Sequence, residues 1–278
     1  MKYIICFFLT AVAFCGCSSS TKKPPVASIQ ADSLLGNWMI IKVDVTGSND
    51  KYTQLMESIV GSLRNSLELS SLSFNTGGAL QVDDGSIELT TGKWSLTADT
   101  FRIIHPTLGR EDKPFTIASL NRDSLVMQHS FDSEKDDLHV VYIFRKLTIP
   151  DSTLNIFDVA NNTWRTKPVQ PESEAVIRQR LKQMLAYYAA YFAIIQNNKI
   201  GYFNREKILV PLMFFDGGLG ITPFEDAGNF PDLFYDEADA KKAHALLEKA
   251  FSNYEYPDLG NKFVQEYIMA LRQISDKL

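Results

Sequence analysis

Few side chains in this sequence are spaced for chemistry. The four histidines, at 105, 129, 139 and 244, form none of the short His–His or Cys–Cys spacings that bind transition metals. His129 and His139 fall on neighbouring predicted strands, where a hydrogen-bonded cross-strand pair is favoured over a zinc site. The sequence therefore predicts no metal site and no cofactor.

Serine, glycine and carboxylate motifs also give no catalytic assignment. The sequence lacks the Gly-x-Ser-x-Gly elbow of hydrolases. Its glycine-rich segment 216–220 (DGGLG) lacks the Gly-Lys-Ser/Thr ending of a phosphate-binding loop. Adjacent acids such as Asp83 and Asp84 fall in predicted turns, where carboxylates are ordinarily solvated and have no acid–base partner. The pattern predicts a protein that is not an enzyme.

All three cysteines belong to the amino-terminal segment, at positions 6, 15 and 17. This segment has a positive start at Lys2, an apolar run of about a dozen residues from Tyr3 to Phe14, and then Gly16-Cys17. Such a run is typical of a secretory signal and is too short to cross a bilayer core of about 30 Å. The rest of the chain has no thiol for a disulfide, a metal site or nucleophilic catalysis.

Gly16-Cys17, followed by three serines, resembles the lipobox of bacterial lipoproteins. The resemblance implies that the signal peptide 1–16 is removed and that Cys17 is acylated, which would hold the chain on a membrane by its lipid. An ordinary secretory signal cut nearby, which would leave a soluble periplasmic protein, is the alternative. The segment after Cys17 has no acidic run, which favours the outer membrane with the protein facing the periplasm.

The composition is that of a globular protein. The chain has 278 residues, of which 45% are hydrophobic and 22% charged, and its formal net charge is −5. No basic stripe is present, so we expect no nucleic-acid partner. Residues 17–32, rich in Ser, Lys and Pro, cannot bury a core and are predicted to be a flexible tether.

Residues 33–149 have the pattern of a β-barrel. Short runs of alternating or β-branched residues are separated by Gly, Asn and Asp turns, which is typical of an antiparallel meander. About eight strands close best as a barrel, because closure removes the exposed sheet edges. The predicted strands are 36–45, 67–74, 79–82, 92–96, 100–104, 114–118, 125–129 and 139–145.

One amphipathic segment interrupts this pattern between the first two strands. Ser48-Asn49-Asp50 can cap a helix, and apolar residues then recur at helical spacing from Tyr52 through Met56 to Leu63. We expect this helix to cover one mouth of the barrel as a lid.

The order of these motifs is similar to that in lipocalin-like domains of Bacteroidetes lipoproteins. The resemblance rests on Gly36-x-Trp38, on Gly92-Lys93-Trp94 and on Arg145 at the end of the last strand. It implies that Arg145 lies over the ring of Trp38 and closes the barrel base by a cation–π contact. It also implies a barrel that either holds a small apolar ligand or is filled by its own side chains.

Residues 150–278 have the pattern of a small α-helical bundle. A long apolar stripe predicts a helix from about 172 to 196, and two further helices follow Asp236 and Pro257. We also expect a short helix at 205–214, bent at Pro211, and a packed aromatic loop at 216–235. The predicted fold is thus a lipocalin-like barrel with an inserted lid helix, followed by a helical domain.

These features together favour a membrane-anchored, non-catalytic binding or interaction module. Tyr52, Met56 and Phe101 are the candidate contacts for a small apolar ligand in the barrel. A structural subunit of an outer-membrane or periplasmic assembly, with an envelope protein as partner, is the second hypothesis. The third hypothesis is an envelope hydrolase, which only the predicted location supports.

The anchor prediction is tested by detergent phase partitioning. We expect the wild-type protein made in a bacterial host to enter the detergent phase and the Cys17→Ala variant to stay in the aqueous phase, because the variant cannot be acylated. A variant that still enters the detergent phase would contradict the assignment of Cys17 as the lipid attachment site.

Overall fold

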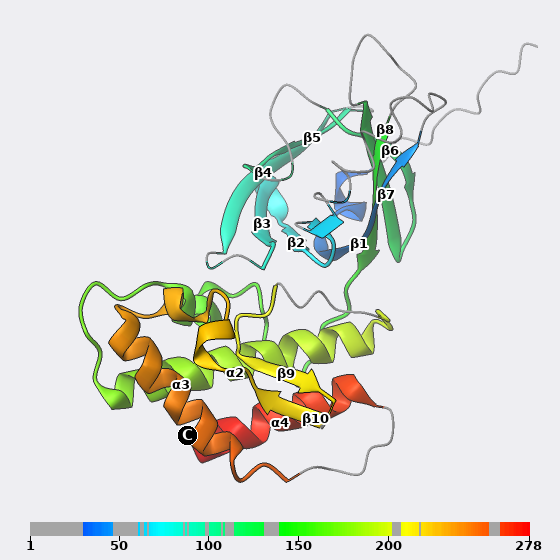
Figure 1. Cartoon of the computed structure of the whole chain (residues 1–278). Helices are drawn as coiled ribbons and strands as arrows, with labels where there is room; N and C mark the ends of the chain where they lie inside the picture. Colours follow the sequence, from blue (N-terminus) through cyan, green and yellow to red (C-terminus); the bar gives the residue numbers. More distant parts are fainter. Residues whose placement is uncertain are drawn as a thin grey trace, which may run out of the picture.

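The chain forms a β-barrel and a helical part that pack against each other (Figure 1). The computed structural model describes residues 30–46, 61, 64–65, 67–85, 87, 89–97, 100–106, 108, 114–130, 139–201, 207–216, 218–255 and 262–278. The predicted signal peptide, Cys17 and most of the predicted lid helix lie outside the described residues.

The barrel consists of eight antiparallel strands. Their bounds are β1 (Gly36–Thr46), β2 (Ser71–Phe74), β3 (Ala79–Asp83), β4 (Thr90–Thr97), β5 (Thr100–Ile104), β6 (Thr116–Leu120), β7 (Ser124–Ser130) and β8 (His139–Lys146). Burial alternates along β8, so that the strand has one buried and one more exposed face. The eight predicted strands are confirmed, except that residues 67–70 of the second one form a turn that precedes β2.

The strand order closes the sheet on itself. The order is β5-β4-β3-β2-β1-β8-β7-β6, so each strand within it lies beside its neighbours in sequence and β1 lies beside β8. The remaining gap between β5 and β6 is bridged by Phe101 and Phe115, whose backbones exchange N–H···O bonds of 3.2 and 2.7 Å. The result is a nearly closed up-and-down barrel, whose edge strands are joined at this one bridge among the described residues.

The second half of β1 extends beyond β2, and residues 64–70 cover its free edge. Ile40 N–H donates to Ser70, and Leu69 N–H donates back to Ile40. Arg64 donates to the Val43 carbonyl at 2.8 Å. This segment therefore supplies the pairing that a longer β2 would otherwise provide.

The helical part contains three long helices: α2 (Glu174–Asn197), α3 (Glu237–Phe251) and α4 (Phe263–Lys277). Ser173 caps α2 and Asp236 caps α3, each by accepting a hydrogen bond from a backbone N–H of the first turn. The apolar stripe predicted for the long helix is buried along α2 and packs against α4 and α3.

The predicted helix at 205–214 is wrong for its described part. Residues Leu212–Phe215 form strand β9, which pairs with β10 (Gly218–Ile221) in a two-stranded hairpin. The turn falls in the glycine-rich segment, where Gly218 adopts a φ of +111° that L side chains disfavour. The aromatic loop that follows does pack, with Phe230 and Phe234 fully buried.

The helical part covers the outer wall of the barrel beside β1 (Figure 1). Met39 points outward from β1 and joins the same apolar cluster as Leu69, Leu147 and the inner face of α2. Three consecutive residues of β1, from Trp38 to Ile40, are therefore buried, because both faces of the strand are covered at this point.

Candidate functional site

The barrel interior is the site that the sequence predicts for a ligand. At the end nearest η1 (Ala31–Ser33), the inward side chains are enclosed: Trp38, Leu72 and Leu125 have no exposed surface. These side chains pack together with Phe74 and Phe144 in one apolar cluster. The described interior at this end is therefore filled by the protein's own side chains.

A continuous row of aromatic rings crosses the interior from one wall to the other. This aromatic row consists of Phe74, Trp94, Phe101, Phe115, Tyr142 and His129. Successive rings lie 5.7 to 6.4 Å apart, mostly edge to face or tilted, which is the favoured arrangement of aromatic pairs. The row makes the interior apolar and polarizable along its length.

The row ends in two side chains that carry polar atoms. His129 stacks on Tyr142 with ring centroids 5.8 Å apart, and Phe115 meets the two rings at 5.2 and 5.9 Å. Burial raises the pKa of Tyr142 to about 12, so its hydroxyl stays protonated at physiological pH. An apolar surface with a few polar groups at one end has the composition of a small-molecule site.

The predicted Trp38–Arg145 contact is corrected by the structure. The cation over the Trp38 ring is Lys146, whose Nζ lies 5.1 Å from the ring centroid. Phe144 points inward, so Arg145 must point outward, where it donates to the Asn198 carbonyl at 2.9 Å. Trp38 itself donates from its indole nitrogen to Leu34 at 2.8 Å, which closes the barrel base.

The backbone conformation at Gly36, two residues before Trp38, favours glycine. Its φ is +110°, and a Cβ at this position would lie 3.4 Å from the Lys146 stem that reaches the tryptophan ring. Of the predicted ligand contacts, Phe101 is a fully buried member of the aromatic row, whereas Tyr52 and Met56 lie outside the described residues.

A second constellation, which the sequence analysis missed, joins the barrel to the helical part. Asp83 at the end of β3 receives two hydrogen bonds from the Arg165 guanidinium, of 3.1 and 3.0 Å. Tyr187 on α2 also donates its hydroxyl to Asp83, and Gly85 donates its backbone N–H. Asp83, predicted to be solvated, is buried because it faces outward exactly where the helical part covers the wall.

The charges of this buried pair stabilise each other. Burial alone would raise the pKa of Asp83, but the Arg165 charge and hydrogen bonds outweigh burial and hold it below its ordinary value. The Arg165 guanidinium also lies over the rings of Trp164 and Tyr187, at 5.0 and 4.6 Å. Because the carboxylate form is favoured, the pair contributes stability above the unfolded pKa and loses it in acid.

Beside this pair, Lys207 donates to the Ser70 hydroxyl at 2.8 Å, and burial lowers the lysine pKa to about 8. A serine next to a lysine of low pKa is a combination that some hydrolases use. Here Ser70 is fully buried, and the adjacent space of about 10 Å³ holds at most about one water molecule. The arrangement therefore joins two parts of the fold and has no room for a substrate.

Lys207 and Gly85 fit closely together. A Cβ on Gly85 would lie 2.5 Å from the Lys207 Cβ, and Gly85 has a φ of +82°. Any larger residue at position 85 would thus push the lysine stem away from Ser70. Glycine is required here both by the backbone conformation and by the approach of the neighbouring chain.

The described residues contain no group of three or more His, Cys, Asp and Glu side chains placed to hold a metal ion. Among the helices of the same residues, none has both the length and the hydropathy needed to cross a bilayer. His129 pairs with Val140 across the β7–β8 ladder, and His139 lies opposite Ser130.

The barrel has the up-and-down architecture that lipocalins share with other eight-stranded barrels. Its antiparallel strands follow sequence order, with the first beside the last. No model of a known protein family matches the sequence, and no curated protein matches it.

Among solved structures, one of bovine odorant-binding protein with its natural ligand is similar to part of the chain. The two share 17% sequence identity with a TM-score of 0.27, and the match covers 45% of this chain and 78% of that one.

The buried ion pair makes a first prediction about stability. Replacing Arg165 by Met should lower the free energy of unfolding by about 3–5 kcal/mol, because it leaves the Asp83 charge buried without its cation. Adding Asp83→Asn to this variant should recover part of the loss. Both are measured by chemical denaturation.

Arg178→Met is the matched control for the Arg165 variant. Arg178 pairs with Glu174 on the surface, with 32% and 64% of the two side chains exposed, and its loss should cost about 1 kcal/mol or less. Equal losses from the two arginine variants would contradict the role assigned to the buried pair.

The low pKa of Lys207 predicts a pH dependence of stability. Between about pH 8 and 10 the folded protein releases the Lys207 proton, whereas the unfolded chain, with a lysine pKa of about 10.4, keeps it. The free energy of unfolding of the wild type, relative to Lys207→Met, should therefore rise by about 1 kcal/mol per pH unit. Denaturant titrations at several pH values measure this difference. A difference that stays constant or falls with pH would show that burial does not lower the pKa of Lys207.

Proposed function

We propose that this chain is a membrane-anchored, non-catalytic binding protein of the bacterial cell envelope, whose barrel takes a small hydrophobic ligand. The aromatic row inside a closed barrel carries the proposal, because it offers a continuous apolar surface with polar atoms at one end. Attachment through acylated Cys17, on the outer membrane facing the periplasm, is the part of the proposal supported by the sequence of residues 1–20.

The proposed ligand position is the end of the aromatic row at Phe115, His129 and Tyr142. The opposite end is filled by Trp38, Phe74 and Phe144 and leaves no room. At the other end, Phe115 and Tyr142 are buried, whereas His129 is only half-buried. A ligand would lie against these three rings and hydrogen-bond to the imidazole or the phenol.

A titration with the apolar dye N-phenyl-1-naphthylamine tests this position. The wild type should bind the dye, and Phe115→Trp should weaken binding at least tenfold because the larger ring occupies the ligand space. Ile104→Trp is the matched control, because Ile104 lies on the neighbouring wall with its side chain 40% exposed outside the core. This control should bind the dye as the wild type does.

Thermal unfolding of the three proteins shows whether they remain folded under the conditions of the titration. No dye binding by folded wild type, or equal affinity in the Phe115→Trp and Ile104→Trp variants, would remove the barrel as the ligand site. The anchoring part of the proposal is tested separately by the Cys17→Ala partitioning.

The filled base favours one second candidate, a rigid subunit of an envelope assembly. A barrel packed with its own side chains and fixed to a helical part by a buried ion pair can present a partner surface without a ligand. Crosslinking in the native host, followed by affinity purification, distinguishes the two: a reproducible protein partner supports the subunit, and monomer alone contradicts it.

A further inference from the structure

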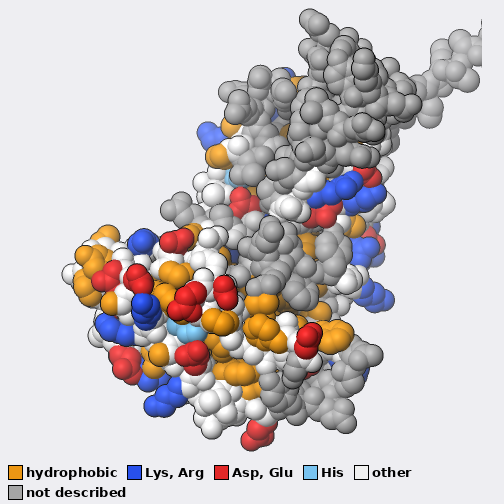
Figure 2. All heavy atoms as spheres, in the orientation of Figure 1, with side chains coloured by type: hydrophobic (Ala, Val, Ile, Leu, Met, Phe, Trp, Pro, Cys, Tyr) orange, Lys and Arg blue, Asp and Glu red, His pale blue; other side chains and the backbone are white. Residues whose placement is uncertain are grey.

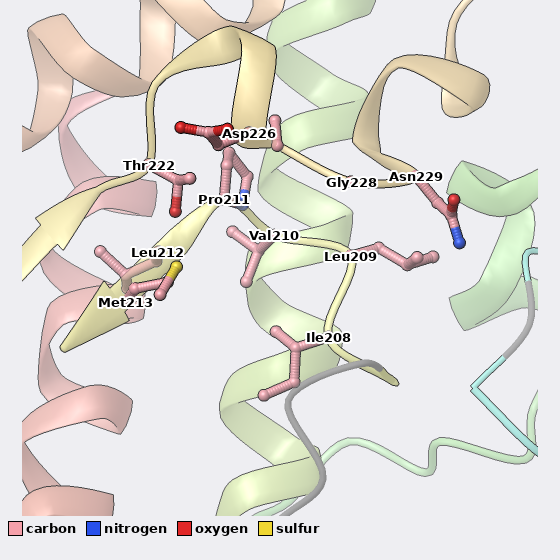
Figure 3. Close-up of a pocket in the computed structure, with 11 residues that line it drawn as sticks. Ile208, Leu209, Val210, Pro211, Leu212, Met213, Thr222, Asp226, Gly228 and Asn229 are labelled. Carbon is pink, nitrogen blue, oxygen red and sulfur yellow. The ribbon is translucent and has the colours of Figure 1, made fainter. Parts of the chain in front are cut away.

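A cavity of about 550 Å³ lies in the helical part, away from the barrel interior (Figure 3). It opens where the two arms of the β9–β10 hairpin diverge. The last backbone bond between the arms runs from Thr222 N–H to the Pro211 carbonyl, at 2.8 Å. Beyond this bond, residues 208–211 form one wall and residues 226–229 form the other. The volume is within the usual range for small-molecule sites.

The floor of this hairpin cavity is apolar and held in place from behind. Leu209, Val210 and Leu212 are buried, and two tyrosines hold their backbone. Leu209 N–H donates to the Tyr188 hydroxyl at 2.8 Å, and Tyr267 donates to the Leu212 carbonyl at 2.5 Å. The floor therefore exists before any ligand binds.

The polar side chains of the cavity are one carboxylate and two neutral groups, a hydroxyl and an amide, which can donate or accept hydrogen bonds. Asp226 is the one charged side chain in the described lining, and it forms no ion pair with any described residue. Figure 3 shows Asp226 and Asn229 on the rim and Thr222 facing the 208–213 segment. Acidic and basic side chains lie among hydrophobic ones on the helical part of the molecule (Figure 2).

Thr222 supplies an independent indication of a ligand. Its hydroxyl is buried and has no hydrogen-bond partner among the residues that the structure describes, although such groups are nearly always paired. The main chain of this residue is held in place, because its carbonyl is bonded to the His244 ring at 2.7 Å and its N–H to the Pro211 carbonyl. A polar group brought into the cavity would lie near this unpaired hydroxyl.

We propose that the hairpin cavity is a second ligand site, which binds a small amphiphilic amine. The ammonium group pairs with the Asp226 carboxylate at the rim, and the apolar body lies on Leu209, Val210 and Leu212. An anionic ligand is disfavoured, since the described lining has a carboxylate and no Lys or Arg. This site is separate from the barrel, so its test does not depend on the proposed barrel ligand.

Hexylamine and hexanol are the probes, added to the ¹⁵N-labelled protein and followed by NMR. Hexylamine should shift the backbone amides of 208–213 and 222–229, and it should bind more tightly than hexanol. Asp226→Asn should weaken hexylamine binding by about 3- to 10-fold and leave hexanol binding unchanged, because only the amine loses a charged partner.

Glu225→Gln is the matched control, since it removes an adjacent exposed carboxylate that does not line the cavity. It should leave the affinity for hexylamine unchanged. Shifts confined to other regions, equal binding of the two probes, or equal effects of the Asp226 and Glu225 variants would each overturn the proposal. Asp226 is exposed, so the variant is expected to fold as the wild type does.

Discussion

The buried ion pair between Asp83 and Arg165 sets the arrangement of the whole molecule. Each charge is stable inside the protein only because the other is present, together with the Tyr187 hydroxyl and the Gly85 N–H. Asp83 belongs to the barrel, whereas Arg165 and Tyr187 belong to the helical part. A shifted docking that buried one of these charges without the other would be unfavourable, so the pair favours one docked arrangement. The Met39–Leu69–Leu147 contact with α2 then contributes the apolar area.

This docking divides the barrel wall into two kinds of surface. At Trp38–Ile40 of β1 both faces are buried, with Trp38 pointing into the barrel and Met39 into the helical part. Elsewhere, as along β8, inward residues alternate with residues that remain partly exposed. The molecule thus has two hydrophobic cores, one inside the barrel and one between the barrel wall and the helical part. It also explains why Arg145, which points outward, binds the end of α2, while its neighbour Lys146 reaches the Trp38 ring.

The two proposed binding regions differ in their chemistry because their elements differ. The aromatic row consists of side chains that point inward from the barrel strands. These inward positions are apolar because the barrel buries them. The hairpin cavity is built where two strands separate, so its walls combine an apolar floor with exposed loop side chains such as Asp226. A neutral apolar ligand fits the first, and a cationic amphiphile fits the second. Neither region contains Asp83 or Arg165. Substitutions in either region should therefore leave the contact between the barrel and the helical part unchanged.

The sequence by itself determined the elements whose pattern is local. Alternation along β7 and β8 and the apolar stripe of α2 predicted strands and helix, since side-chain periodicity follows directly from backbone geometry. It also held an overlooked signal at Asp216-Gly217, a pair typical of hairpin turns, in the segment that forms β9 and β10. Only the tertiary structure decided that Asp83 is buried, because its partner Arg165 lies 82 residues further along the chain. The filled base of the barrel and the cavity beside Thr222 were likewise undetermined by sequence pattern, because packing depends on the shapes of side chains brought together from distant strands and loops.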